Sequence, residues 1–110
     1  VELVENDLEA TPEAEATVRA AVAEMLEHGA DQIVLGCTHY PFLLPVLERV
    51  VAGRGVTFVD PSPAVARRVV QLLDRYGLHV DPAHRAEYTF RTFADEAYRL
   101  RLERKALGAL

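Results

Sequence analysis

The sequence predicts an α/β fold in which a parallel sheet is flanked by helices. Segments with apolar residues at helical spacing alternate with two short β-branched runs, and the connections between them are short. Both runs stand between turn residues, which suits strands that are buried on both faces of a sheet. An isolated pair of strands is marginal in water, so we expect that part of the sheet is missing from this chain.

The first predicted helix begins after Thr11, a suitable N-cap, with Pro12 at the first helical position. Its apolar stripe should end near Gly29, where glycine is a stop signal. The run QIVLG, 32–36, predicts the first buried strand, and the leucine- and valine-rich segment 42–52 predicts a second helix.

The run VTFV, 56–59, predicts the second buried strand. Ser62-Pro63 repeats the cap-plus-proline start of a helix, which should end at Gly77. The apolar stripe of this helix comprises Val65, Val69, Leu72, Leu73 and Tyr76.

The C-terminal third begins with a polar linker at 79–86. The alternating segment EYTFRTF, 87–93, predicts a half-buried strand. Asp95 is a suitable cap for a last helix. The 110 residues are enough for one small domain with a modest core.

The composition excludes several classes of function. The net charge of −5, with no basic run, argues against nucleic acid or an anionic membrane as partners. No apolar run is long enough to cross a bilayer, and the acidic start VELVENDLEA does not fit a signal peptide. A single cysteine allows no internal disulfide, which fits the cytoplasm.

The only cysteine, Cys37, follows the first predicted strand, where functional groups of α/β proteins gather. A lone cysteine in an apolar segment is more often an inert core residue. His39, two positions on, could exchange a proton with the same substrate. Metal binding would need more ligands than these two, and a zinc site is not expected because the other histidines lie in segments expected to face solvent: His28, His79 and His84. Acid–base catalysis by the Cys37 thiol therefore remains as the candidate chemistry.

The segment VLGCTHYPFLLPVL resembles the second cysteine motif of the glutamate racemases, in the cofactor-independent aspartate/glutamate racemase superfamily. VELVEND is similar to the family segment that ends in a functional glutamate. VTFVDPSPAVARRV and YTFRTFADEAYRLRLERKALG resemble the segments that follow the motif. The resemblance covers essentially the whole chain, but it corresponds only to the C-terminal part of a family member.

The resemblance implies a two-domain enzyme in which two cysteines work on opposite faces of the substrate α-carbon, without pyridoxal phosphate, metal or other cofactor. Cys37 matches the second-domain cysteine. His39 matches a histidine that assists proton transfer, and Glu5 an acidic residue that orients this histidine, so these three are the candidate catalytic residues. Thr38 would bind the substrate. The complete enzyme would interconvert L- and D-glutamate and supply the D-isomer for peptidoglycan, and hence for cell-wall biogenesis and cell shape.

By the same resemblance, residues 1–78 belong to the second racemase domain, and 79–110 form a linker, strand and helix that return to the first domain. The first catalytic cysteine has no counterpart here, so the expected partners are glutamate and either a missing N-terminal part or a second copy of the chain. Three alternatives stay open: a non-catalytic binding or association module, a racemase for another amino acid, and a homodimer with two Cys37 thiols across one cleft.

Overall fold

The computed structural model describes residues 1–108 of the chain, which divides into two compact units, Val1–Pro61 and a second that begins at Ser62. The predicted segment 79–110 thus ends in two residues, 109 and 110, that lie outside the described part. In the residues described, no helix is both long and apolar enough to span a bilayer.

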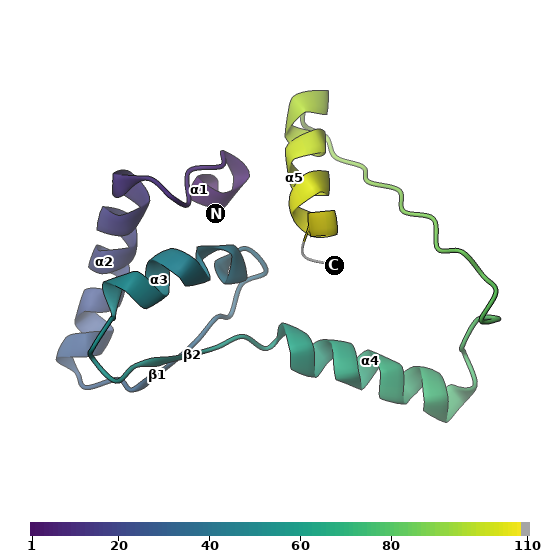
Figure 1. Ribbon diagram of the computed structural model, residues 1–110, viewed down its shortest axis with the longest axis horizontal. Helices are drawn as coiled ribbons and strands as arrows, with labels where there is room; N and C mark the ends of the chain where they lie inside the picture. The colour runs from purple at the N-terminus through teal and green to yellow at the C-terminus, as the bar shows by residue number, and fades with distance from the viewer. Residues whose placement is uncertain (109–110) are drawn as a thin grey trace. The chain divides into compact units, whose positions relative to one another are not determined.

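The first unit contains the α/β part of the chain (Figure 1). Its elements in chain order are α1 (Glu2–Glu5), α2 (Pro12–Glu27), β1 (Gln32–Val34), the 3₁₀ helix η1 (Tyr40–Leu43), α3 (Leu44–Val50) and β2 (Thr57–Val59). The strands β1 and β2 pair in parallel, with Ile33 opposite Phe58. The predicted α/β class with a small parallel sheet is therefore confirmed.

The helix α2 begins as predicted. The Thr11 hydroxyl accepts a hydrogen bond from the Ala14 N–H (3.2 Å), and Pro12 occupies the first helical position, where an N–H would have no partner. The helix ends at Glu27, and Gly29 takes φ +76°, a conformation that glycine adopts without strain. Local sequence signals thus set both ends of α2.

The predicted helix over 42–52 is divided into η1 and α3. Proline lacks an N–H and therefore fits only the first turn of a helix. Pro41 lies in the first turn of η1, and Pro45 lies in the first turn of α3. The two prolines thus mark two successive helix starts, where the hydrophobic pattern alone predicted one.

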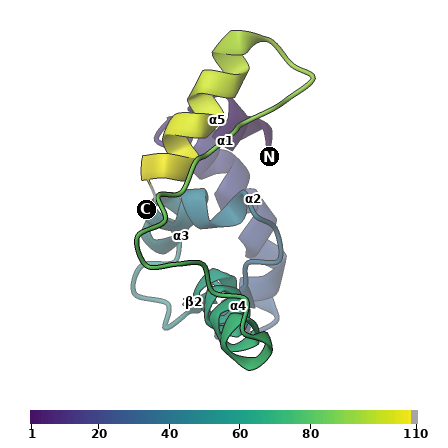
Figure 2. The ribbon, with the colours of Figure 1, turned by 90° about the vertical axis from the view of Figure 1, so that its right-hand side faces the viewer.

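A single apolar core holds the first unit together, with ten buried residues: Val4, Val18, Val22, Ile33, Leu35, Leu43, Val46, Leu47, Val50 and Val51. The helices α2 and α3 contact each other over this core, and both ribbon views show them side by side (Figures 1 and 2). The α1 residue Val4 is fully buried, which attaches this short helix to the rest of the unit.

Within the first unit, the strands are covered on one face only. Ile33 is buried in the core, whereas Val34, which points to the opposite face, is 65% exposed, and its β2 partner Val59 is 37% exposed. The expectation that both strands are buried on both faces is therefore wrong for this chain. The physical reason is that the helices of the first unit pack on the side of Ile33, and no layer of the described unit covers the side of Val34.

The second unit contains two helices, α4 (Ser62–Tyr76) and α5 (Glu96–Gly108). Residues 77–95 between them form neither helix nor strand, as Figure 1 shows. The predicted strand over 87–93 is therefore wrong. An alternating sequence becomes a strand only where a neighbouring strand accepts its backbone hydrogen bonds, and the described residues offer this segment none.

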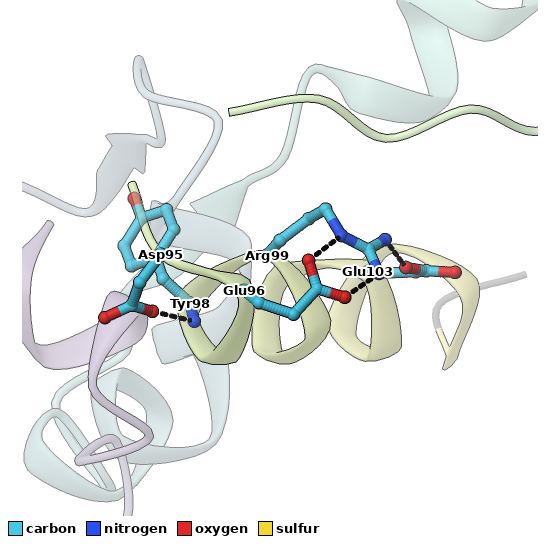
Figure 3. A network of polar contacts seen from close by, with 5 residues as sticks. All are labelled: Asp95, Glu96, Tyr98, Arg99 and Glu103. Atoms are coloured by element: carbon cyan, nitrogen blue, oxygen red, sulfur yellow. Dashed lines mark hydrogen bonds and ion pairs between the residues drawn. The ribbon is translucent and has the colours of Figure 1, made fainter. Parts of the chain in front are cut away.

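The helix α5 begins at the predicted cap (Figure 3). The Asp95 carboxylate accepts a hydrogen bond from the Tyr98 N–H (2.8 Å). Arg99 donates to both carboxylate oxygens of Glu96 (2.9 and 2.6 Å) and also pairs with Glu103. The hydrogen bond from Arg99 lowers the pKa of Glu96 below its usual value. A cap and a charge-assisted network thus support a helix that buries none of its described residues.

Candidate functional site

The cysteine lies just beyond the carboxyl end of a strand. The strand β1 ends at Val34, Leu35 is buried, and Gly36 leads directly to Cys37. The Cys37 side chain is partly buried. Because Leu35 is buried, the backbone that leads to Cys37 is anchored in the core, while the Cys37 sulfur stays within reach of solvent.

The turn that follows the cysteine brings His39 back to it. The Tyr40 N–H donates to the Cys37 carbonyl (3.1 Å), and the Phe42 N–H donates to the His39 carbonyl (3.2 Å). This tight winding places His39 Nδ1 3.8 Å from Cys37 Sγ, which is contact distance for a weak sulfur hydrogen bond. Because Leu43 at the end of η1 is buried, the turn is attached to the core.

The third group of the site comes from a distant part of the sequence. Glu5 Oε1 lies 3.3 Å from His39 Nε2, and the two side chains are 26% and 27% exposed. Glu5 follows the fully buried Val4 on α1, so the packing of α1 on the core determines where this carboxylate lies. Both ring nitrogens of His39 thus face a partner, one the thiol and the other the carboxylate.

This order of groups favours a definite distribution of protons. A carboxylate only accepts hydrogen bonds, so it favours a proton on Nε2 of the neutral ring. Nδ1 is then left as an acceptor that faces the sulfur. If the thiol transfers its proton to Nδ1, the imidazolium that forms lies between a thiolate and a carboxylate. The arrangement is suited to moving a proton on and off Cys37.

Thr38 stands apart from this arrangement. Thr38 is exposed, and η1 begins after His39 without a side-chain cap. Thr38 follows Cys37 directly in the sequence, and its exposure leaves it accessible to an external group.

The remaining histidines lie elsewhere. All three are exposed, as expected: His28, His79 and His84. His28 Nδ1 is 2.8 Å from the Glu24 carbonyl, and His79 Nε2 is 2.6 Å from Asp74 Oδ1. Across residues 1–108, no three His, Cys, Asp or Glu side chains gather in a group that could hold a metal ion.

Local reasoning from the sequence could find two members of the site and not the third. Cys37 and His39 stand two residues apart after a predicted strand, which is a visible signal. Glu5 lies in a short acidic segment with no pattern that links it to His39. Only the family resemblance predicts that Glu5 belongs to the site.

Comparisons with known proteins agree with the resemblance. The model of the Asp/Glu/Hydantoin racemase family matches residues 2–69, which is more than half of the chain. A glutamate racemase of Roseiflexus sp. is 47% identical over 78 residues, which are 71% of this chain and 28% of that protein. A glutamate racemase of Deinococcus radiodurans is 40% identical over 98 residues, which are 89% of this chain and 33% of that protein.

A solved structure shows the same fold. The crystal structure of glutamate racemase from Thermus thermophilus in complex with β-chloro-D-alanine superposes with a TM-score of 0.69 at 33% identity, and covers 94% of this chain and 40% of that one. The chain therefore spans about a third of the length of the curated relatives that it matches.

Proposed function

Because this chain belongs to the Asp/Glu/Hydantoin racemase family, we propose that it is the part of a glutamate racemase that contributes one of two catalytic cysteines. The observation that carries the proposal is the line of three groups in the first unit: Cys37 Sγ, 3.8 Å from His39 Nδ1, whose Nε2 is 3.3 Å from Glu5 Oε1. The other cysteine, in this proposal, belongs to the part of a racemase that this chain does not span.

The proposed reaction is a proton exchange at the α-carbon of glutamate. One thiolate removes the α-proton, so that the C–H bond breaks, an S–H bond forms and the electron pair stays on the substrate. The thiol on the opposite face then gives its proton to the carbon, and the configuration inverts. Cys37 acts as the base in one direction and as the acid in the other.

His39 and Glu5 make Cys37 usable in both directions. The α-proton of an amino acid is very weakly acidic, so the thiolate must be held close and the developing charge must be stabilised. His39 takes up or returns the thiol proton through Nδ1. Glu5, which does not touch the sulfur in this geometry, is a positioning residue that orients the ring through Nε2.

Thr38 is proposed to hydrogen-bond the substrate. Thr38 is exposed and follows Cys37 directly in the sequence, which suits a residue that binds an amino acid held near the thiol. The relatives at 40–47% identity are glutamate racemases, which favours glutamate over another amino acid.

The wider proposals follow from this assignment. Residues 1–78 belong to the second domain of the racemase, and the segment from 79 onward returns to the first. The complete enzyme works in the cytoplasm without a cofactor and supplies D-glutamate for peptidoglycan, and thereby supports cell-wall biogenesis and cell shape.

The test supplies the part that the chain does not span. We define the N-terminal complement as the portion of the Roseiflexus glutamate racemase that precedes the segment matched by this chain. The chain and a tagged complement are co-expressed and co-purified, then incubated in D₂O with L-glutamate and, separately, with D-glutamate. Deuterium at the α-carbon and inversion of configuration are both expected, by NMR and chiral chromatography.

The control variants separate chemistry from assembly. Cys37→Ala should abolish inversion while the complex still forms, so that any remaining deuterium uptake is confined to the face of the other cysteine and retains configuration. His28→Ala, which changes an exposed histidine outside the site, should leave both deuterium uptake and inversion unchanged. A complex that forms but takes up no deuterium, or that still inverts glutamate after Cys37→Ala, would overturn the proposal. Exchange on another amino acid and not on glutamate would overturn the substrate assignment.

A further inference from the structure

The short helix α1 ends in a tight turn built around Asp7. The Leu8 N–H donates to the Leu3 carbonyl (2.8 Å), and the Asp7 N–H donates to the Val4 carbonyl (3.4 Å). Asp7 has φ +56°, which is the left-handed conformation. Two such hydrogen bonds around a left-handed residue form a Schellman motif, which satisfies carbonyl groups at the C-terminus of a helix. The helix that this motif closes has Glu5 as its last residue.

The helix α4 ends in the same motif, but with a glycine at the left-handed position. The Leu78 N–H donates to the Leu73 carbonyl (2.9 Å). The Gly77 N–H donates to the Asp74 carbonyl (3.3 Å), and Gly77 has φ +62°. Glycine is the usual residue at this position because it has no Cβ that would clash. Across the described part of the chain, Asp7 is the only residue other than glycine with a positive φ, so α1 closes at a cost that α4 avoids.

The turn around Asp7 is also bonded to the start of α2. The Leu8 carbonyl accepts two hydrogen bonds from Thr11, one from its N–H (3.1 Å) and one from its hydroxyl (2.8 Å). The same hydroxyl accepts from the Ala14 N–H in the first turn of α2 (3.2 Å). Leu8 therefore bonds to α1 through its N–H and to the cap of α2 through its carbonyl. A change of the backbone conformation at Asp7 would break this connection between the two helices.

A helix as short as α1 depends on such outside support. A single helical turn is unfavourable to form by itself, so α1 is stabilised by the burial of Val4 and by the turn at its C-terminus. The Glu5 N–H donates to the Val1 carbonyl (3.1 Å), which places Glu5 inside this one turn. Glu5 Oε1 lies 3.3 Å from His39 Nε2, so a shift of about half an ångström would take the pair beyond hydrogen-bond distance. The contact of Glu5 with His39 therefore requires that the helix closes correctly at Asp7.

We propose that Asp7 is a positioning residue for the reaction, because its left-handed backbone closes α1 and thereby holds the Glu5 carboxylate on His39. Costly backbone conformations persist where the surrounding structure requires them, and they gather at functional sites. Here the costly conformation stands two residues after the carboxylate that it positions. The inference rests on the proposed function for the catalytic role of His39, but the contact between Glu5 and His39 can be measured without catalysis.

The first test is a series of substitutions that differ in how easily they adopt a positive φ. Asp7→Gly adopts it freely and Asp7→Asn about as readily as aspartate, whereas Asp7→Ala does so at a cost and Asp7→Val at a greater one. In the full chain, the ring ¹⁵N shifts of His39 should stay unchanged in Asp7→Gly and Asp7→Asn. In Asp7→Ala, and more so in Asp7→Val, they should move toward the values of Glu5→Ala. Hydrogen exchange at the Leu8 amide should become at least about tenfold faster in Asp7→Val, because the turn that protects it opens.

The matched control is Gly77→Val, which places the same β-branched residue at the left-handed position of the α4 motif. It should weaken the end of α4 and leave the His39 shifts and the exchange of the Leu8 amide unchanged. Circular dichroism shows whether each variant folds. If Asp7→Val does not fold, the comparison of Asp7→Gly with Asp7→Ala decides the question.

A kinetic measurement follows in the complex with the N-terminal complement. Asp7→Ala should lower kcat by about tenfold with a smaller change in KM, because a slightly misplaced group slows the chemical step. Asp7→Gly should retain kcat because it keeps the closed turn, and Gly77→Val should retain it because it changes a different helix.

Three outcomes would overturn the inference. The His39 shifts could stay unchanged in every folded Asp7 variant, or Gly77→Val could change them as much as Asp7→Val does. Asp7→Asn could change them as much as Asp7→Ala does, which would assign the role to the carboxylate and not to the backbone. If His39 responds as expected but the complex shows no α-proton exchange, the proposed chemistry fails and the positioning of Glu5 by Asp7 stands.

Discussion

Glu5 and His39, which lie far apart in the sequence, meet through Oε1 and Nε2 at 3.3 Å. The contact joins α1 to the turn after β1, and it completes a line of groups that ends at Cys37 Sγ. Glu5 is held in place by its buried neighbour Val4. The turn that contains His39 is held in place by the buried Leu43. The core therefore determines the geometry of the site.

Replacing Glu5 should disturb the orientation of the imidazole without removing the thiol. In the complex with the N-terminal complement, Glu5→Ala should lower kcat by roughly 10- to 100-fold, the cost of a slightly misplaced catalytic group, with a smaller change in KM. Glu5→Gln keeps an acceptor oxygen and should restore part of the loss. Ring ¹⁵N shifts of His39 should show that Glu5→Ala, unlike Glu5→Gln, reduces the share of the Nε2–H tautomer.

The matched control for this prediction is Glu2→Ala, which removes an exposed carboxylate from the same short helix. It should leave kcat and the His39 shifts unchanged. Equal effects of the two alanine variants would show that loss of negative charge or of helix stability, and not the contact with His39, explains the result.

Val4 should contribute more to stability than its place near the chain start suggests. Val4→Ala removes two methyl groups from a fully buried side chain and should lower the free energy of unfolding by about 1.5–3 kcal/mol. Urea unfolding followed by circular dichroism measures the change. Val1→Ala, at a position that is 53% exposed, should change it by less than about 0.5 kcal/mol. A similar small effect of both variants would mean that α1 is not part of the cooperative core.

The hydroxyl of Thr11 should account for a measurable part of the stability of α2. It accepts from the Ala14 N–H and donates to the Leu8 carbonyl at 2.8 Å. Thr11→Ala should cost about 1 kcal/mol, and Thr11→Ser, which keeps the hydroxyl, should retain most of the stability in the same urea titration. An equal loss in both variants would contradict the capping role.

The helix α5 should weaken in acid. Arg99 lowers the pKa of Glu96 in the folded chain below the ordinary value of 4.5. The stabilising contact is thus fully present above the ordinary pKa and is lost as the pH falls through the lowered folded pKa. The Cα chemical shifts of α5 should move toward coil values across that acidic interval. In Arg99→Ala this pH dependence should be smaller, and an unchanged dependence would assign the effect to other carboxylates.

Several features of the fold could be predicted because their causes are local. The start of α2 depends on the neighbouring residues Thr11 and Pro12, and the start of α5 depends on the cap Asp95. The alternation of helices and strands likewise follows from the local spacing of apolar residues. Hydrophobic periodicity did not predict the division between η1 and α3, because the positions of Pro41 and Pro45 determine it. The strand expected over 87–93 does not form, since a strand also needs a partner.

The sequence by itself determined the α/β class, the place of Cys37 after a strand and its proximity to His39, because short-range spacing and capping fix all three. Only the tertiary structure decided that Glu5 meets His39, because the burial of Val4 brings a distant helix to the site. It also decided that, within the first unit, one face and one edge of β1 stay uncovered. The pattern of a buried strand specifies that its side chains prefer apolar neighbours, but whether those neighbours are present depends on chain segments far away in the sequence.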